Sequence, residues 1–511
     1  MTHPQPYSSE LTVDQEKSLG SLALRSSFFV LIAKLFRYGF VFLSQIILMN
    51  LLSPADFGLM RYVTIVLGIV NLINEAGLGV ALVQKKHLHE NETASSFSLI
   101  IAVCLGLYAI VFLSAPSIAS FFGNARLTDL IRVGGLSAPL GAVSIVHRSL
   151  MQRRFRFGPL AVIEASSALT GSITAIVLGY LGFGVWSLVW SVLVYNTSSS
   201  LVTIIVGNRL RGNFIAVAAS MSLWVFGVSA VVQRIIDYGT SNVDFLVVGK
   251  LFGEHTLGIY SMAFSVISLP QMALGAVLVS VAIAIFSRVQ DDDERLRGAF
   301  LRLTRVTTIL SIPYFILLFN LAPELMHAVS FIKSSDKWVP AAPFIKILAP
   351  MGLLYCLNSF PSLVWIAKRK IKLRIIWAAF SLVTMIAAIL SGCSFGVIGI
   401  CSALCIRAVV FFPVTLYVNY RSFQLLPRIY LRVIAPPLVC GAAACAALWG
   451  LGAMDFLHFE KHPYAKIVWY SLVCLALYGF SLKIALGSVF TELFDVMSEA
   501  IRKKPLSREA Q

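Results

Sequence analysis

The sequence predicts an all-α, polytopic membrane protein with about fourteen transmembrane helices. Composition is the first reason, because 58% of the 511 residues are hydrophobic and only 13% are charged. A soluble domain carries about 25% charged residues. The second reason is that the apolar residues come in long runs, and a helix needs roughly 20 of them to cross the hydrocarbon core. Lipid is therefore the expected solvent for most of the surface.

The apolar runs follow one another along nearly the whole chain. A transmembrane barrel would instead show segments of about ten residues with alternating polarity. The expected spans are 27–50, 58–83, 95–114, 129–147, 159–180, 184–206, 222–248, 257–287, 299–321, 341–366, 374–391, 395–418, 433–453 and 465–486. Glycines and very short turns separate the two closest pairs, at Gly182 and at Gly392.

Positive charge is unevenly distributed over the predicted turns. The formal net charge is +17, and thirty of the 41 Lys and Arg residues fall on one side of the predicted membrane. Lys and Arg are kept on the cytoplasmic side of such proteins. The bias therefore predicts that both termini are cytoplasmic, and it accounts for the basic composition without a nucleic-acid partner.

Short motifs recur in the same order in the two halves of the chain. The matched pairs are Leu51–Pro54 with Leu251–Glu254, Ala115-Pro116 with Ala322-Pro323, Ala138–Gly141 with Ala349–Gly352, and Phe183–Val185 with Phe395–Val397. The offset grows slowly from 200 to 212 residues. This pattern predicts two parallel six-helix lobes related by a pseudo-two-fold axis along the membrane normal.

The repeat also predicts a division of the chain. The expected parts are a cytoplasmic N-terminal segment (1–20), an N-lobe (21–212), a C-lobe (213–420), spans 13 and 14 (421–486) and a cytoplasmic tail (487–511). Apolar residues at helical spacing in the tail, followed by Arg502 to Lys504, predict an amphipathic helix on the membrane surface.

Several motifs resemble one known family. They are Leu52–Gly58 (Leu-Ser-Pro-x-Asp-Phe-Gly), Glu75–Gly79, Phe183–Trp186, Asn242–Asp244 with Gly249-Lys250, Leu257–Tyr260, Asp291–Asp293 with Arg295–Arg297, and Lys337-Trp338. Together they are similar to the bacterial polysaccharide transporters, the Wzx-type lipid-linked oligosaccharide flippases of the multidrug/oligosaccharidyl-lipid/polysaccharide exporter superfamily. The resemblance covers roughly residues 20 to 420.

The resemblance implies a transporter that works by alternating access in the bacterial inner membrane. Its implied substrate is an undecaprenyl-diphosphate-linked oligosaccharide, moved from the cytoplasmic to the periplasmic leaflet for O-antigen, capsule or exopolysaccharide synthesis. The implied partners are this lipid-linked oligosaccharide, the bilayer, a polysaccharide polymerase and a chain-length regulator.

Ionisable residues at membrane depth are the candidate site, because each costs about 2.5–3.5 kcal/mol on insertion scales and must face protein or water. Cations there can replace the water around a diphosphate, and Arg binds phosphate oxygens bidentately. The phosphate-binding candidates are Lys34, Arg37, Arg234 and Arg407. The candidates for other polar contacts in the cavity are Arg61, Glu75, Glu164, Gln233 and Asn242. Carboxylates that could couple transport to a cation are Glu75, Asp237 and Asp244.

Structural interpretations of these residues stay open at this point. Lys34 and Arg37 can snorkel to the cytoplasmic surface, since they share a helix face near its start. Arg61 can lie at the outer interface, Arg234 and Asp237 can form a structural pair, and Glu75 can pair locally.

The sequence predicts neither an enzyme nor a cofactor or metal site. It has no phosphate-cradling Gly-Lys-Ser/Thr loop, and its eight cysteines lack metal-ligand spacing. Coupling to a proton or sodium gradient is the one expected use of an ion. Two alternatives remain, namely a cation-coupled drug or small-lipid exporter of the same superfamily and a membrane-embedded polysaccharide polymerase or ligase.

Overall fold

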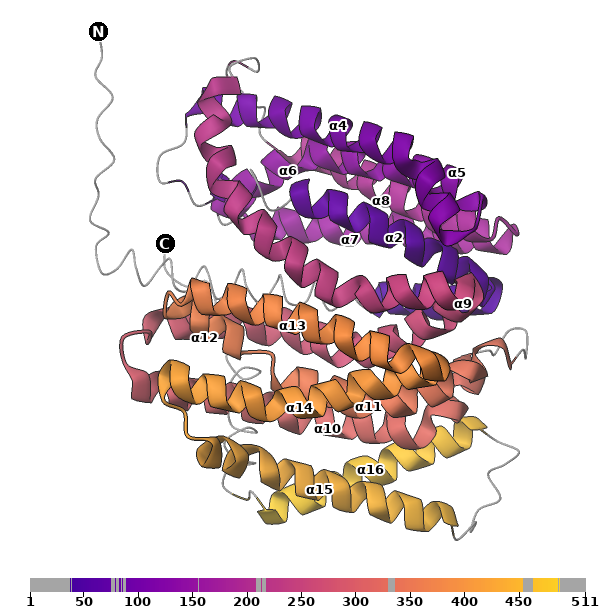
Figure 1. Ribbon diagram of the computed structural model, residues 1–511, viewed down its shortest axis with the longest axis vertical. Helices are drawn as coiled ribbons and strands as arrows, with labels where there is room; N and C mark the ends of the chain where they lie inside the picture. Colours follow the sequence, from indigo (N-terminus) through magenta and orange to yellow (C-terminus); the bar gives the residue numbers. More distant parts are fainter. Residues whose placement is uncertain are drawn as a thin grey trace, which may run out of the picture. The chain divides into compact units, whose positions relative to one another are not determined.

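The computed structural model describes residues 37, 39–74, 79, 82, 83, 85, 89–154, 156–207, 213, 217–329, 336–453, 463–485 and 487. The expected N-terminal segment (1–20) and residues 488–511 of the expected tail lie outside this set. All regular secondary structure within it is helical (Figure 1).

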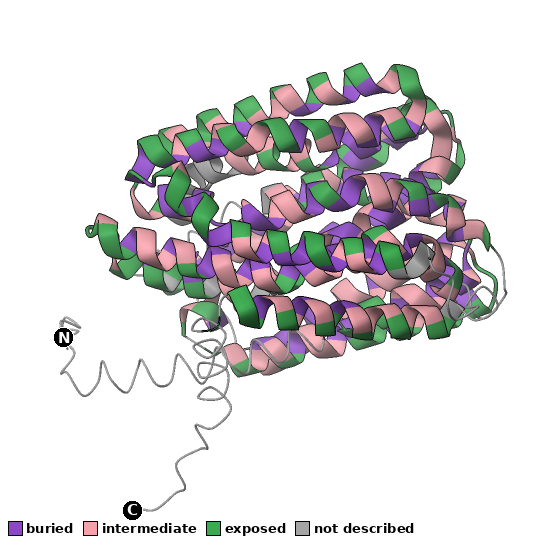
Figure 2. Cartoon of the chain, turned by 90° about the horizontal axis from the view of Figure 1, so that it is seen from below, coloured by how far each residue is buried: buried purple, intermediate pink, exposed green. Residues whose placement is uncertain are grey.

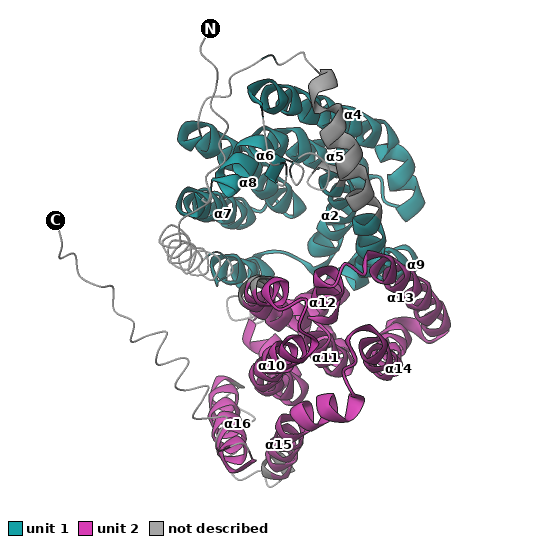
Figure 3. Ribbon diagram, turned by 90° about the vertical axis from the view of Figure 1, so that its left-hand side faces the viewer, with its two compact units in different colours: residues 1–258 teal, residues 259–511 magenta. Residues whose placement is uncertain are grey.

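The chain divides into two compact units, residues 1–258 and 259–511 (Figure 3). In the first unit a helix at Gly39–Leu51 precedes α2 (Pro54–Asn74), α4 (Glu90–Phe122), α5 (Arg126–Gly135), α6 (Ser137–Arg153), α7 (Phe157–Tyr180), α8 (Val185–Val206) and the first part of α9 (Val217–Arg288). In the second unit the rest of α9 precedes α10 (Asp293–Val329), η2 (Asp336–Ala341), α11 (Ala342–Leu357), α12 (Pro361–Ala367), α13 (Ile371–Gly392), η3 (Cys393–Phe395), α14 (Gly396–Phe423), α15 (Pro427–Ala453) and α16 (Pro463–Ala485). The expected lobe boundary at residues 212 and 213 stays a prediction.

The described chain contains eleven helical stretches long and apolar enough to cross a membrane. Exposed positions, green in Figure 2, recur along the helices. Large apolar side chains are among the exposed residues, for example Leu113, Ile205 and Trp449. Exposed apolar surface on this scale is unfavourable in water but favourable in lipid. The protein is therefore an all-helical polytopic membrane protein.

Glycine backbones break the longest helical stretches at or near the predicted turns. The turn predicted at Gly392 is displaced, because Gly392 ends α13 with φ −83° and the corner lies at Gly396. Gly253 has φ 79° and ψ 176°, which interrupts α9 between its two predicted spans. Gly396 has φ 72° and starts α14 directly after α13 and η3. Side chains other than glycine rarely adopt such positive φ values, so these corners need glycine.

Four buried hydroxyl groups of α10 are hydrogen-bonded within their own helix. On α10 the buried hydroxyls of Thr304, Thr307, Thr308 and Ser311 each donate to the carbonyl four residues earlier, at 2.6–2.9 Å. Apolar side chains of the same helix, among them Ile312 and Ile316, pack against α15 and α16. The core of the second unit can thus contain hydroxyl groups without unpaired donors.

The start of α2 and the part of α9 that follows Gly253 pack with their main chains in contact. A Cβ added to Gly58 would overlap the carbonyl oxygen of Glu254, and a Cβ added to Gly258 would overlap the carbonyl oxygen of Pro54. Residues 54 and 254, and likewise 58 and 258, are separated by the 200-residue offset of the sequence repeat. The contact is therefore reciprocal, as in a two-fold symmetric interface where i meets j and j meets i.

Asp56 joins the start of α2 to the start of α8. Its Oδ2 accepts hydrogen bonds from the Ser53 amide at 2.9 Å and hydroxyl at 2.7 Å, and its Oδ1 accepts one from the Val185 amide at 3.0 Å. The first amides of a helix have no partner within the helix, and a carboxylate there also favours the helix dipole. Two of the motifs used for the family resemblance, at 52–58 and 183–186, are thus linked through one side chain.

Candidate functional site

Two of the candidate residues, Arg37 and Glu164, form an Arg–Glu–Arg bridge with Arg148, which is not among those candidates. Glu164 lies on α7, seven residues after its start, and Arg148 lies on α6, five residues before its end. Oε1 of Glu164 is 2.7 Å from Nη2 of Arg148, and Oε2 is 3.7 Å from Nη1 of Arg37. Each side chain is about one quarter exposed. The bridge therefore joins three helices and stays within reach of solvent.

Arg61 is held by neutral groups on α9. Its Nη2 donates to Oδ1 of Asn242 at 3.2 Å, and its guanidinium carbon lies 3.6 Å from the ring centroid of Phe245. Asn242 and Phe245 are buried, at 8% and 2% exposure. This geometry fixes the plane of the guanidinium by a hydrogen bond and a cation–π contact.

Two tyrosines join the same pair of helices. The Tyr62 hydroxyl donates to the carbonyl of Gly249 at 2.7 Å, and the Tyr238 hydroxyl donates to the carbonyl of Ile65 at 2.9 Å. A Cβ added to Gly249 would contact the Tyr62 ring. Glycine therefore lets the ring approach the α9 backbone closely enough for this bond.

The remaining candidates on α9 lie at different depths in the packing. Gln233 and Arg234 are half-buried, Asp237 is exposed, and Asp244 is fully buried. The suggested structural pairing of Arg234 with Asp237 stays a hypothesis.

Arg407 lies at the middle of α14 in the second unit. It is 9% exposed. Its Nη2 donates to the carbonyl and hydroxyl of Ser381 at 2.9 and 2.6 Å, its Nε donates to the Thr384 hydroxyl at 3.3 Å, and its guanidinium carbon lies 4.5 Å from the Phe411 ring centroid. Among the described residues no carboxylate forms an ion pair with it. Arg407 is thus a buried cation surrounded by neutral dipoles.

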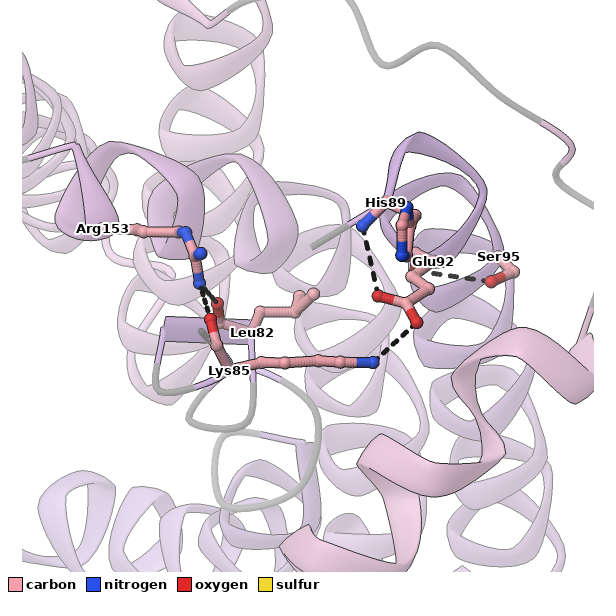
Figure 4. Close-up of polar contacts among 6 residues, drawn as sticks. All are labelled: Leu82, Lys85, His89, Glu92, Ser95 and Arg153. Atoms are coloured by element: carbon pink, nitrogen blue, oxygen red, sulfur yellow. Dashed lines mark hydrogen bonds and ion pairs between the residues drawn. The ribbon is translucent and has the colours of Figure 1, made fainter. Parts of the chain in front are cut away.

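A separate polar network joins Leu82, Lys85, His89, Glu92 and Arg153 (Figure 4). Arg153 donates to the carbonyls of Leu82 and Lys85, and the Lys85 ammonium lies 2.6 Å from Oε1 of Glu92. The other oxygen of Glu92 accepts the His89 amide at 3.2 Å, at the start of α4. Because these bonds end on main-chain groups and on a helix start, the network stabilises the fold.

Two candidates, Lys34 and Glu75, lie outside the described residues. The described part of the chain contains no cluster of His, Cys, Asp and Glu suited to a metal ion. Each unit by itself offers guanidinium and hydroxyl groups, which are donors for anions and for sugar hydroxyls.

Sequence reasoning missed the partners that orient the arginines. Arg148 is not among the candidate residues that the sequence indicates. The sequence does contain a signal for its pairing with Glu164. Because α6 and α7 are consecutive helices joined by a short turn, Arg148, five residues before the end of α6, comes near Glu164, seven residues after the start of α7. Ser381, Thr384 and Phe411 had no such signal, because single hydroxyl and aromatic residues are common in membrane helices.

A family model described as "Polysaccharide biosynthesis protein" matches residues 47–343, which is more than half of the chain. Curated relatives include the lipopolysaccharide biosynthesis protein WzxC of Escherichia coli (strain K12), 24% identical over 71% of this chain and 73% of the relative. The succinoglycan biosynthesis transport protein ExoT of Rhizobium meliloti (strain 1021) is 29% identical over 63% of this chain and 65% of the relative. The teichuronic acid biosynthesis protein TuaB of Bacillus subtilis (strain 168) is 23% identical over 60% of this chain and 63% of the relative.

The fold is similar to that of a solved structure, the lipid II flippase MurJ in an inward closed conformation. The TM-score is 0.72, with 15% identity, over 92% of this chain and 99% of that one. This similarity is one of fold alone. By the match of the family model, the chain belongs to the polysaccharide biosynthesis protein family.

Proposed function

We propose that the protein is a flippase that moves an undecaprenyl-diphosphate-linked oligosaccharide from the cytoplasmic to the periplasmic leaflet of a bacterial inner membrane. The product would feed the synthesis of an O-antigen, a capsule or an exopolysaccharide. A polysaccharide polymerase and a chain-length regulator would be the partners that use it. The names of ExoT, a transport protein, and MurJ, a lipid II flippase, favour this class of activity.

The observation that carries the proposal is the buried cation Arg407. It lies eleven residues from the start and sixteen from the end of α14, which is about 17 and 24 Å at 1.5 Å per residue. A charged group at such depth is costly unless it is paired or functional. Since its described partners are neutral, an anionic ligand such as a diphosphate would supply the missing counter-charge.

The first unit supports the same chemistry. Arg61 presents a guanidinium oriented by Asn242 and Phe245, and the Arg–Glu–Arg bridge brings two more guanidinium groups together. A diphosphate that leaves the interface must exchange water for such donors. Arginine provides them with fixed fork geometry that matches phosphate oxygens.

We infer fourteen spans in two six-helix lobes. Two of the eleven candidate stretches, Gln233–Gly275 and Ile371–Phe423, each cover two predicted spans and contain a glycine corner. The helix at Gly39–Leu51 covers part of the first predicted span. The reciprocal contact of residues 54 and 58 with 254 and 258 favours the 200-residue repeat on which the lobes rest. Cytoplasmic termini remain part of this proposal.

The test is a reconstituted assay in which the purified protein moves a fluorescent undecaprenyl-diphosphate oligosaccharide across a liposome bilayer. Transport should depend on the protein and be competed by unlabelled undecaprenyl diphosphate. A drug-exporter activity would instead appear as transport of a cationic dye without diphosphate competition, and that result would refute the proposal. Chain extension without transport would indicate a polymerase.

A further inference from the structure

We infer that the Glu164 carboxylate occupies the position of the substrate's phosphate. It lies between Arg37 and Arg148 while no substrate is bound, and a substrate phosphate displaces it. The inference rests on the proposed function and deepens it, because it assigns a regulating residue to the phosphate site. It also adds Arg148 to the residues that would bind phosphate.

The contacts of Glu164 are those a phosphate group would make. Each carboxylate oxygen meets a different guanidinium, at 2.7 Å to Arg148 and 3.7 Å to Arg37. Within the described chain both partners are arginine side chains from different helices. A phosphate also presents two oxygens to two donors, so it can occupy the same position, with a hydrogen bond from Arg148 and an ion pair with Arg37.

The environment of Glu164 distinguishes it from a carboxylate that only stabilises the fold. Glu92 meets one lysine and a main-chain amide at a helix start, and its side chain is 12% exposed. Glu164 is 26% exposed and its arginines are 26% and 25% exposed. An incoming anion can therefore reach the arginines without unfolding a helix, and the longer of the two contacts is the easier one to replace.

The consequence is a competition for two arginines. In the empty state the carboxylate contacts both guanidinium groups and keeps them oriented. Binding of phosphate releases Glu164, and return of Glu164 expels the phosphate. Because only the fraction of molecules whose arginines are not occupied by Glu164 can bind the ligand, the apparent affinity falls in proportion to that fraction. Its removal should therefore tighten binding and slow release.

The experiment compares the wild type with Glu164→Gln in nanodiscs, using undecaprenyl diphosphate as the probe and tryptophan fluorescence as the readout. We expect the Kd of Glu164→Gln to be roughly tenfold lower than that of the wild type. Its rate in the liposome flipping assay should fall at saturating substrate. The matched control is Glu92→Gln, which removes a paired carboxylate of the same unit and should leave the Kd unchanged.

A double variant separates competition from an indirect effect. Glu164→Gln with Arg148→Gln should lose the gain in affinity, because one of the released donors is gone. If Glu164→Gln does not fold, Glu164→Asp keeps the charge but withdraws it by one methylene, and its Kd should lie below that of the wild type.

The outcomes distinguish the two ideas. Tighter binding by Glu164→Gln alone, with Glu92→Gln unchanged, supports the substitution mechanism. Wild-type binding with equal or weaker binding by the Glu164 variants overturns it and leaves the proposed function intact. Absence of diphosphate binding and of flipping in the wild type overturns the proposed function itself.

Discussion

Gly258 lies so close to Gly58 that a Cβ on Gly258 would be 3.1 Å from the main-chain nitrogen of Gly58. The same Cβ would overlap the Pro54 carbonyl, and the reciprocal Cβ on Gly58 would overlap the Glu254 carbonyl. Small residues let membrane helices approach at backbone distance. Two glycines separated by 200 residues therefore control how closely these helix starts pack.

Replacing Gly258 by Ala should separate these helix starts. The new methyl group meets backbone, which cannot rotate away as a side chain can, and overpacking costs typically about 1–3 kcal/mol. We expect a lower Tm in detergent and a lower flipping rate. Gly106→Ala is the matched control, because no atom lies within 4 Å of its added Cβ. A Gly258→Ala protein as stable and active as Gly106→Ala would contradict the close contact.

Asp56 should prove necessary for stability rather than for substrate binding. Asp56→Ala leaves the Val185 amide and the Ser53 groups without their acceptor, and hydrogen bonds to a charged group contribute about 1.5–3 kcal/mol. We expect a clear loss of thermal stability, with Asp56→Asn intermediate because it keeps one carbonyl oxygen. Binding of undecaprenyl diphosphate by the folded fraction should be unchanged. Weakened binding at full stability would assign Asp56 to the site instead.

The sequence was sufficient to predict the fold class, because low charge and long apolar runs leave helical spans as the main solution. It also predicted turns at Gly182 and around Gly253, where the structure has positive φ values, whereas the turn predicted at Gly392 has its positive φ four residues later, at Gly396. It could not predict which candidate charges meet. Rotation of each helix about its axis decides that, and apolar runs without strong periodicity do not encode it.

The candidate site shows the same limit in detail. Glu164 was identified by its depth, but its pairing with Arg148 and Arg37 depends on three helices. Arg61 was identified as a polar residue of the second span, whereas Asn242 and Phe245 come from a helix about 180 residues later in the chain. The contacts of Arg37 and Arg61 are long-range in sequence, so only the folded chain brings these residues to their partners, whereas Arg148 and Glu164 are 16 residues apart on consecutive helices.

Arg407 should be the arginine whose charge and shape both matter. Arg407→Ala removes the buried cation, and we expect a roughly 10- to 100-fold loss of diphosphate affinity, the effect of one hydrogen bond to a charged group. Arg407→Lys should recover part of the affinity, because an ammonium keeps the charge but lacks the planar fork. Arg126→Ala, at an exposed position of α5, is the control and should bind as the wild type does. Normal affinity in Arg407→Ala would remove the observation that carries the proposed function.

Cation coupling is the remaining prediction, and Asp244 is its best-placed described residue. It is fully buried on α9, nine residues before Gly253, which is about 14 Å along the helix. A carboxylate at this depth is costly to keep charged, so a bound proton or Na⁺ would stabilise one state of the transporter over the other. In proteoliposomes, an imposed proton or sodium gradient should change the flipping rate of the wild type. Asp244→Asn should respond to neither gradient while still binding undecaprenyl diphosphate, and Asp129→Asn, at an exposed position, should respond normally. If the wild type flips substrate at the same rate with and without either gradient, transport is not coupled to a cation and follows the concentration gradient of the substrate. Downstream polymerisation would then make transport directional by consuming the product.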